Sequence, residues 1–324
     1  ALSIVTGRPI EISNIRAGRK KPGLMRQHLT CVEAARTICN GTTSPAGIGA
    51  TQLSFEPNAV VPGDYRFSIG SAGSCLLVLQ TVLPPLMLAL AASKVSLEGG
   101  THNPWAPPFD FLQRVYAPLL SKMGPKIDLE LERYGFYPGG GGSVVASIEP
   151  TAQLRGLKLL ERGRVHTKHV RAVVSNLAKD IAEREVSVIR RLSGWPAKCF
   201  ESRAVKAHGP GNVITLETQS EHLAELFVGF GRPGVPAEKV ARELWKEFHE
   251  FDELGVPVGP HLADQILLPI GLANWQNPAN VSQFRTGKPT QHTLTHIDLL
   301  QRFLSVEITI VEDETGACTI SCGA

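Results

Sequence analysis

Hydrophobic and polar positions along the first part of the chain switch between two periods, as expected of a mixed α/β protein. Residues 9–16 alternate like a strand and run into a basic, glycine-containing loop at 17–23. Residues 27–39 then carry apolar side chains at helical spacing and stop at Asn40-Gly41. A basic loop between a strand and a helix offers backbone N–H groups and a helix N-terminus, which together suit an anion.

A second region repeats this order of elements. Residues 64–69 alternate like a strand, residues 70–74 form a glycine turn, and an apolar helix follows that Pro84 and Pro85 should end or kink. The glycine run at 139–142 is not a P-loop, because no Gly-Lys-Ser/Thr follows it. The other elements predicted here are a strand, a loop, a helix and a hairpin: 95–98, 99–104, 109–122, and 127–131 with 143–148.

The pattern changes near Arg164 and predicts a compact inserted α/β unit of roughly a hundred residues. Its predicted elements are a strand, an amphipathic helix and two further strands: 166–175, 180–192, 197–205 and 212–218. We therefore expect three segments: a first part of a large domain, an inserted small domain and a return segment, at 1–162, 163–258 and 259–324. Four histidines of this stretch are interpreted as surface residues: His166, His169, His208 and His222.

The return segment follows a long amphipathic helix at 237–254 and a break at 255–260. The next helix begins near His261 and carries Asp264 and Gln265 in its first turn. A carboxylate there usually complements the helix dipole, but it can equally bind a ribose hydroxyl or orient an imidazole. A last helix and two strands should complete the chain, the strands at 305–311 and 317–321 around an acidic turn.

His292 and His296 lie four residues apart in the stretch 289–297, just before that last helix. Zinc binding would need a third ligand, and the glutamate of a His-Glu-x-x-His helix is absent. The stretch could simply close the turn before the helix, with Thr290 or Thr293 as its cap. Alternatively, a neutral imidazole attacks an electrophilic phosphorus and forms a covalent intermediate. The stretch alone does not separate these interpretations.

Composition narrows the class of protein. With 324 residues, 43% hydrophobic and 19% charged, the chain is typical of a soluble globular protein of two or three structural units. The net charge of +3 says little, but residues 8–26 hold six cations against one acid, as a phosphate-rich ligand would require. Six cysteines without a C-x-x-C pair favour reduced thiols and the cytoplasm. The most apolar run, 75–92, is broken by Gln80 and two prolines, so we expect no membrane span.

Five motifs together resemble the RNA 3′-terminal phosphate cyclases of the bacterial type, in the order that the family has them. They are IRAGRKKPGLMRQHL at 15–29, GSAGS at 70–74, GGTHNPWAPP at 99–108, GFYPGGG at 135–141 and LADQ at 262–265. The resemblance covers nearly the whole chain. It implies a large domain of three repeated α/β units with a smaller α/β domain inserted, which agrees with the change of pattern near Arg164.

The resemblance also implies an activity. The family uses ATP and a divalent metal, Mg²⁺ or Mn²⁺, to adenylylate a histidine, passes the AMP to an RNA 3′-phosphate, and lets the 2′-hydroxyl displace it to form a 2′,3′-cyclic phosphate. His292 matches the nucleophile position of the family. The ATP-binding positions match Gln80, Pro107, His261, Leu262, Ala263, Asp264 and Gln265. The phosphate-binding and RNA-binding positions match Arg16, Arg19, Gln27 and His28.

Three differences from the family pattern accompany the resemblance. The family has a glycine-rich strand and loop, with a metal-binding glutamate and a phosphate-binding arginine, before the position of Ala1; without them we expect adenylylation to be slow or absent. His261 replaces a common tyrosine, and residues 275–288 are longer than in relatives. The metal ligands and the oligomeric state are not predicted.

Two rival functions remain. The family has a non-catalytic branch of RNA-binding ribosome-assembly factors, recognised by loss of the nucleophilic histidine, and His292 argues against it. A zinc hydrolase is the third and weakest option.

Overall fold

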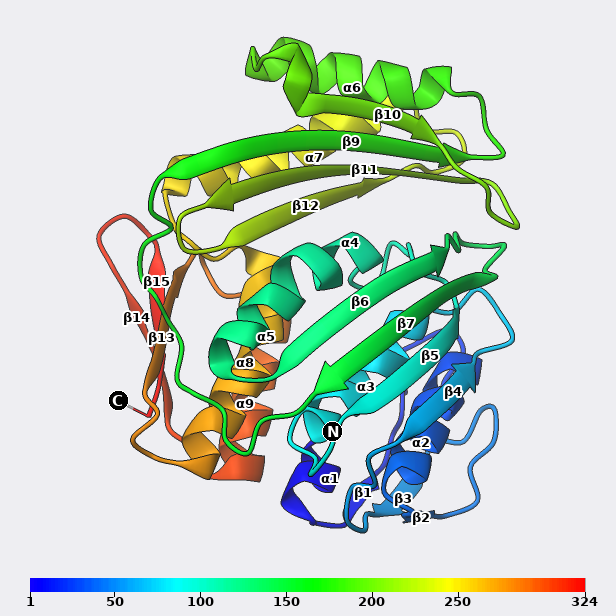
Figure 1. Cartoon of the computed structure of the whole chain (residues 1–324), viewed down its shortest axis with the longest axis vertical. Helices are drawn as coiled ribbons and strands as arrows, with labels where there is room; N and C mark the ends of the chain where they lie inside the picture. The colour runs from blue at the N-terminus through cyan, green and yellow to red at the C-terminus, as the bar shows by residue number, and fades with distance from the viewer. Residues whose placement is uncertain (324) are drawn as a thin grey trace. The chain divides into compact units, whose positions relative to one another are not determined.

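Helices and β-strands alternate along the chain in the computed structural model, which describes residues 1–323 (Figure 1). The α/β fold class is confirmed. The helices are α1 (Leu2–Thr6), α2 (Arg26–Ile38), α3 (Cys75–Leu86), α4 (Phe109–Phe111), a π-helical turn (Leu112–Tyr116), α5 (Ala117–Met123), α6 (Asp180–Ser193), α7 (Ala237–Leu254), α8 (Pro260–Gln276) and α9 (Gln291–Leu304). The strands are β1 (Ile10–Ile12), β2 (Thr42–Thr43), β3 (Leu53–Glu56), β4 (Asp64–Ser68), β5 (Ser93–Gly99), β6 (Lys126–Arg133), β7 (Gly142–Glu149), β8 (Lys158–Leu159), β9 (Val165–Ser175), β10 (Phe200–Ala204), β11 (Gly211–Ser220), β12 (Ala224–Phe230), β13 (Ser282–Thr286), β14 (Ile308–Glu312) and β15 (Cys318–Cys322).

The chain divides into two compact units. Unit 1 comprises residues 1–109, 125–152 and 206–210, and unit 2 comprises residues 110–124, 153–205 and those from 211 onward. Each unit contains two β-sheets among its described residues: β1-β3-β2 and β4-β5-β7-β6 in unit 1, β10-β9-β11-β12 and β14-β15-β13-β8 in unit 2. The predicted domain boundaries at 162/163 and 258/259 stay a prediction.

One sheet topology occurs in both units. In unit 1, β4 and β5 are parallel, and β5 pairs antiparallel with β7, which pairs antiparallel with β6. In unit 2, β8 and β13 are parallel, and β13 pairs antiparallel with β15, which pairs antiparallel with β14. The three-stranded sheet β1-β3-β2 reproduces the last three strands of this order. Three sheets of related topology are what the repeated α/β units require.

The shared topology gives three connections the same place in their sheets. In each sheet, one strand pairs with the second strand of a hairpin: β1 with β3, β5 with β7, and β13 with β15. After each of these strands the chain enters a helix: α2 after β1, α4 after β5, and α9 after β13. The basic loop and Pro107 lie on the first two connections, and His292 lies directly after the third, in the first turn of α9. The three strand-to-helix connections therefore occupy equivalent positions in their repeats, although their sequences are not similar.

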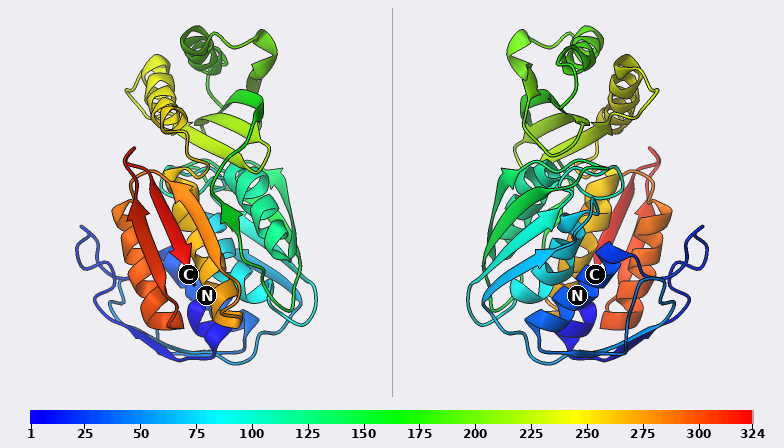
Figure 2. Two further views of the ribbon diagram at one scale, coloured as in Figure 1. Left: turned by 90° about the vertical axis from the view of Figure 1, so that its left-hand side faces the viewer. Right: turned by 90° about the vertical axis from the view of Figure 1, so that its right-hand side faces the viewer.

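The segment from β9 to α7 builds the fourth sheet and covers one of its faces with helices. In Figures 1 and 2, α6 and α7 lie together on one side of β10-β9-β11-β12. Alternate residues of β9 point into this layer, so Val170, Ala172 and Val174 are buried with Phe227 and Phe248. The alternate positions Thr167, His169 and Arg171 lie on the opposite face and are polar, as the period-two pattern of a strand allows, and Val173 continues that face as a buried apolar residue.

Three predicted elements differ from the observed ones at their ends. The first strand stops at Ile12, because Asn14 and Arg16 adopt left-handed backbone conformations, each with φ of 55°. Residues 197–199 form a 3-10 turn before β10, where the amide of Cys199 donates to the Pro196 carbonyl. The last helix ends at a left-handed Ser305, so β14 begins only at Ile308.

Candidate active site

His292 lies in the first turn of α9, exposed to solvent. The hydroxyl of Thr290 caps this helix by accepting a hydrogen bond from the Thr293 amide at 3.1 Å. The capping interpretation is thus confirmed for Thr290. A helix N-terminus also favours negative charge beside it, because its first amides have no partner within the helix.

His296 lies one turn further along α9 and, unlike His292, has a carboxylate partner. Its Nδ1 lies 3.1 Å from the backbone oxygen of Asp264 and 3.3 Å from the Asp264 Oδ1. A backbone carbonyl only accepts, so Nδ1 must carry the proton and the Nε2 lone pair of the neutral ring points away from Asp264. Of the two histidines, the structure therefore orients His296 through Asp264.

The first turn of α8 places the residues predicted to bind ATP in two environments. The side chains of Leu262 and Ala263 are buried, so any ligand would meet this part of the turn through backbone atoms. Asp264 and Gln265 are half-buried, and His261 is exposed. The His261 ring lies 3.1 Å from a carboxylate oxygen of Glu247, and this hydrogen bond raises the His261 pKa above its ordinary value.

Glu225, which the sequence analysis did not select, caps the same helix. Its Oε1 accepts a hydrogen bond from the Gly259 amide at 2.6 Å, and the residue is only 4% exposed. Burial raises the pKa of this carboxyl to about 8, although the bond from Gly259 opposes the shift. A single acid in the otherwise apolar strand β12 was the signal that could have revealed it.

Glu225→Gln should remove a pH dependence of stability. The folded state holds the Glu225 proton more tightly than the unfolded state, whose carboxyl has the ordinary pKa of 4.5. Stability from this group is therefore complete below pH 4.5 and is lost as pH rises towards 8. Between pH 5 and pH 8.5, the free energy of unfolding measured with denaturant should fall by roughly 2–4 kcal/mol more in the wild type than in the Glu225→Gln variant. Glu314→Gln, at an exposed acid, is the control; a parallel loss in both variants would contradict the assignment.

The basic loop of unit 1 is closed by one of its own arginines. The Arg16 guanidinium donates to the backbone oxygens of Lys21 at 2.8 Å and Gly23 at 3.0 Å. Arg19, at the tip of the loop, is exposed. The two arginines therefore differ: Arg16 is committed to the shape of the loop, and Arg19 is the one that presents its guanidinium to solvent.

Gln27 and His28 connect the first turn of α2 to its surroundings. Gln27 Oε1 accepts a hydrogen bond from the Ser74 amide at 2.7 Å, which joins this turn to the 70–74 glycine turn. The His28 Nδ1 accepts from the Met25 amide at 3.0 Å and so caps the helix. Burial first, and then the charge of Arg16, lowers the His28 pKa, as suits a ring that must stay neutral to accept this bond.

Further backbone contacts gather the glycine loops of unit 1 around Ala72. The Asn103 amide group donates to the Ala72 carbonyl at 2.8 Å, and the Gly100 amide donates to the Gly73 carbonyl at 2.7 Å. Gly140 has φ of 64°, and a β-carbon there would lie 2.9 Å from the Ala72 α-carbon. Only glycine permits this approach.

The predicted Gln80 and Pro107 are both half-buried, Gln80 within α3 and Pro107 two residues before α4.

The predicted site residues thus fall into two groups. The structure brings Gln27 to the 70–74 turn in unit 1 and Asp264 to His296 in unit 2. Within residues 1–323, no three side chains of histidine, cysteine, aspartate or glutamate gather as a metal site.

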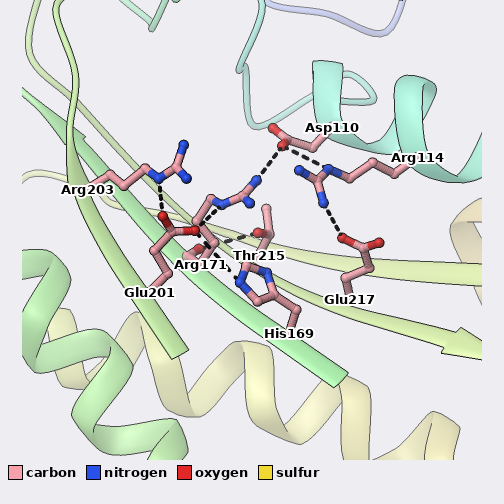
Figure 3. Close-up of polar contacts among 8 residues, drawn as sticks. All are labelled: Asp110, Arg114, His169, Arg171, Glu201, Arg203, Thr215 and Glu217. Carbon is pink, nitrogen blue, oxygen red and sulfur yellow. Dashed lines mark hydrogen bonds and ion pairs between the residues drawn. The ribbon is translucent and has the colours of Figure 1, made fainter. Parts of the chain in front are cut away.

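A polar network on the face of the fourth sheet opposite α6 and α7 was not predicted (Figure 3). Arg171 on β9 contacts Glu201 at 2.9 Å and lies 3.7 Å from Asp110, just before the π-helical turn. Arg114 in that turn contacts Glu217 on β11 at 2.8 Å. These pairs hold this face of the sheet against residues 110–116, and one of them joins Arg114 and Glu217, which are 103 residues apart along the chain.

The same network corrects one interpretation of the histidines. His166, His208 and His222 are exposed as expected, but His169 is half-buried and its Nε2 lies 3.7 Å from a Glu201 oxygen. Burial first, and then Arg171, lowers the His169 pKa. The ring belongs to the network because its strand position faces the same side as Arg171, which a count of isolated histidines does not show.

Comparison with known proteins assigns the family. Residues 1–310 match the family model described as RNA 3′-terminal phosphate cyclase. A protein of that name from Koribacter versatilis (strain Ellin345) is 44% identical over 318 residues, 98% of this chain and 88% of the relative. The chain belongs to the RNA 3′-terminal phosphate cyclase family. A second relative of that name, from Ectopseudomonas mendocina (strain ymp), is 43% identical over 309 residues, 95% of this chain and 89% of its own length.

Three structural elements, one in unit 1 and two in unit 2, carry the positions that the resemblance to the RNA 3′-terminal phosphate cyclase family selected. These are a histidine at the start of α9, a helix N-terminus at α8 with an acid in its first turn, and a basic loop before α2. The individual roles of His292, the α8 turn and the basic loop stay predictions. No helix within residues 1–323 combines the length and the apolar character needed to cross a bilayer.

Proposed function

We propose that the protein is an ATP-dependent RNA 3′-terminal phosphate cyclase that works through a covalent histidine–AMP intermediate. The observation that carries the proposal is the exposed His292 ring in the first turn of α9, in a chain of this family. RNA with a 3′-phosphate and ATP are the substrates, as the names of the relatives suggest. Six unpaired cysteines support a reducing compartment, the cytoplasm.

In the first step, the neutral His292 imidazole attacks the α-phosphorus of ATP. A P–N bond forms, the P–O bond to pyrophosphate breaks, and the ring proton is lost. The amides at the start of α9 and the α8 turn offer hydrogen-bond donors to the phosphates, and Asp264 or Gln265 can bind the ribose. A divalent cation, when bound, would neutralise the pyrophosphate; no step is assigned to a metal-binding residue of this chain.

In the next two steps, the RNA 3′-phosphate takes AMP from the histidine, and the neighbouring 2′-hydroxyl displaces AMP. An oxygen of the 3′-phosphate attacks the phosphoramidate, which gives RNA(3′)pp(5′)A and frees the ring. The 2′-hydroxyl then attacks the 3′-phosphorus, AMP leaves, and the cyclic phosphodiester forms. The Arg19 guanidinium can bind the RNA phosphate in a bidentate manner and offset the charge that grows in each transition state.

Incubation of the protein with ATP and a 5′-labelled RNA that ends in a 3′-phosphate tests the proposal. The expected product carries an end that phosphatase cannot remove, because a cyclic phosphodiester is no substrate for a monoesterase. RNA with a terminal 2′-deoxynucleotide should stop at the adenylylated RNA, since the displacing hydroxyl is missing. RNA binding without either product would contradict the proposal and favour a non-catalytic ribosome-assembly factor.

A further inference from the structure

Two large aromatic side chains stand exposed on neighbouring loops of unit 1. Trp105, on the loop between β5 and α4, is 80% exposed, and Tyr137, on the loop between β6 and β7, is 57% exposed. Their ring centroids lie 5.9 Å apart with an interplanar angle of 79°. Exposing aromatic rings to water opposes the hydrophobic effect, and an exposed pair held edge to face is typical of a binding surface.

Both loops are joined by direct contacts to the glycine turn at residues 70–74. Asn103, two residues before Trp105, donates to the Ala72 carbonyl, and Gly140, three residues after Tyr137, packs against the same residue. The Ser74 amide of this glycine turn also donates a hydrogen bond to Gln27, at the start of α2, and α2 follows the basic loop. The aromatic pair is thus built next to the backbone that unit 1 offers to phosphates, within one continuous set of contacts.

Cationic side chains belong to the segments that flank the hairpin loop of Tyr137. The Arg133 guanidinium donates to the Gly141 carbonyl in the same hairpin loop. Residues 206–210 lie against this loop: Ala207 bridges to Tyr134, and the His208 ring lies beside Gly141. Lys206 and His208 are both exposed there. An aromatic pair with cations beside it is the arrangement that proteins use for single-stranded nucleic acid, with rings for the bases and cations for the backbone.

We propose that Trp105 and Tyr137 form a stacking platform for an unpaired base next to the RNA 3′ end. The proposal rests on the proposed function, which supplies an RNA whose terminal phosphate must reach the phosphate-binding loops. One ring stacks on the face of the base, and the perpendicular ring bounds its edge. Every base has such a face, so the platform selects unpaired ends over duplex ends and discriminates little between sequences.

Anisotropy titrations with a short, 5′-fluorescein-labelled, single-stranded RNA ending in a 3′-phosphate test the platform without ATP. Trp105→Ala and Tyr137→Ala should each raise the Kd roughly tenfold, whereas Trp105→Phe should stay within about threefold because it keeps a stacking ring. Leu90→Ala, at a residue of unit 1 that is 97% exposed, should bind like the wild type.

RNAs with a single abasic nucleotide, placed in turn at each of the last four positions, separate stacking from other losses. The wild type should lose affinity at the stacked position, and the Trp105→Ala variant should lose little more there, because base and ring act as one pair. Equal Kd values for wild type and both alanine variants, or abasic losses that are the same with and without Trp105, would overturn the platform. Wild-type cyclisation is assayed in parallel. If the binding results support the platform but the wild type does not cyclise RNA, only the proposed function is contradicted. If the wild type cyclises RNA but the binding results show no platform, only this inference is contradicted.

Discussion

Replacement of His292 by alanine should abolish transfer of AMP from α-labelled ATP to the protein, by at least about 10³-fold, because no other group would replace the attacking nitrogen. His296→Ala should retain most of the label. The labelled bond of the wild type should survive alkali and break in acid, as a phosphoramidate does. His249→Ala, at an exposed histidine of α7 outside the site, should label like the wild type.

The structure makes this comparison sharper than the sequence does. The two rings lie four residues apart on α9, and the one that Asp264 orients is His296, not His292. Orientation by a carboxylate is a common way to prepare a reactive imidazole, so His296 is a genuine competitor. Label that persists without His292, or that disappears only without His296, would transfer the nucleophile assignment to His296 and make Asp264 its positioning residue.

Arg19→Ala should slow cyclisation of 3′-phosphorylated RNA by roughly 10- to 100-fold, whereas Lys20→Ala and Lys21→Ala should each cost only a few-fold. An exposed guanidinium offers phosphate a planar, bidentate donor that an ammonium group lacks. Arg19→Lys should therefore recover only part of the lost kcat/KM. Steady-state kinetics with varied RNA provides the measurement, and similar losses at positions 19, 20 and 21 would show that the loop acts only through its total charge.

Arg16→Ala should also lower activity, but for a different reason. Its guanidinium donates to the Lys21 and Gly23 carbonyls, so its removal leaves the loop to be closed by backbone contacts such as that from the Gly23 amide to the Ile15 carbonyl. Hydrogen exchange of residues 17–23 should accelerate in Arg16→Ala and remain unchanged in Arg19→Ala. Unchanged exchange in both variants would instead place Arg16 among the residues that contact phosphate directly.

Elements whose stability is local were well predicted from the sequence. The helices α2, α6 and α7 were expected within a few residues of their observed ends, because their apolar residues recur at helical spacing and glycine or asparagine follows them. Two strands were missed for different reasons. Two-residue β8 has no pattern of its own and pairs with β13 more than a hundred residues later, and β12 contains no alternation because its residues are mostly buried.

The sequence by itself determined the α/β class, the order of most elements and, through five motifs, the resemblance that the family comparison confirmed. Its motifs also selected His292, but they could not show which histidine meets Asp264, because those residues are 32 positions apart and meet only when α8 packs on α9. The tertiary structure alone decided that Arg16 closes its loop, that Glu225 caps α8 and that Trp105 meets Tyr137. The Arg16 contacts depend on the left-handed turns of its own loop, and the other two join separate segments of the chain; neither kind of contact leaves a periodic signal in the sequence, so only the folded structure reveals them.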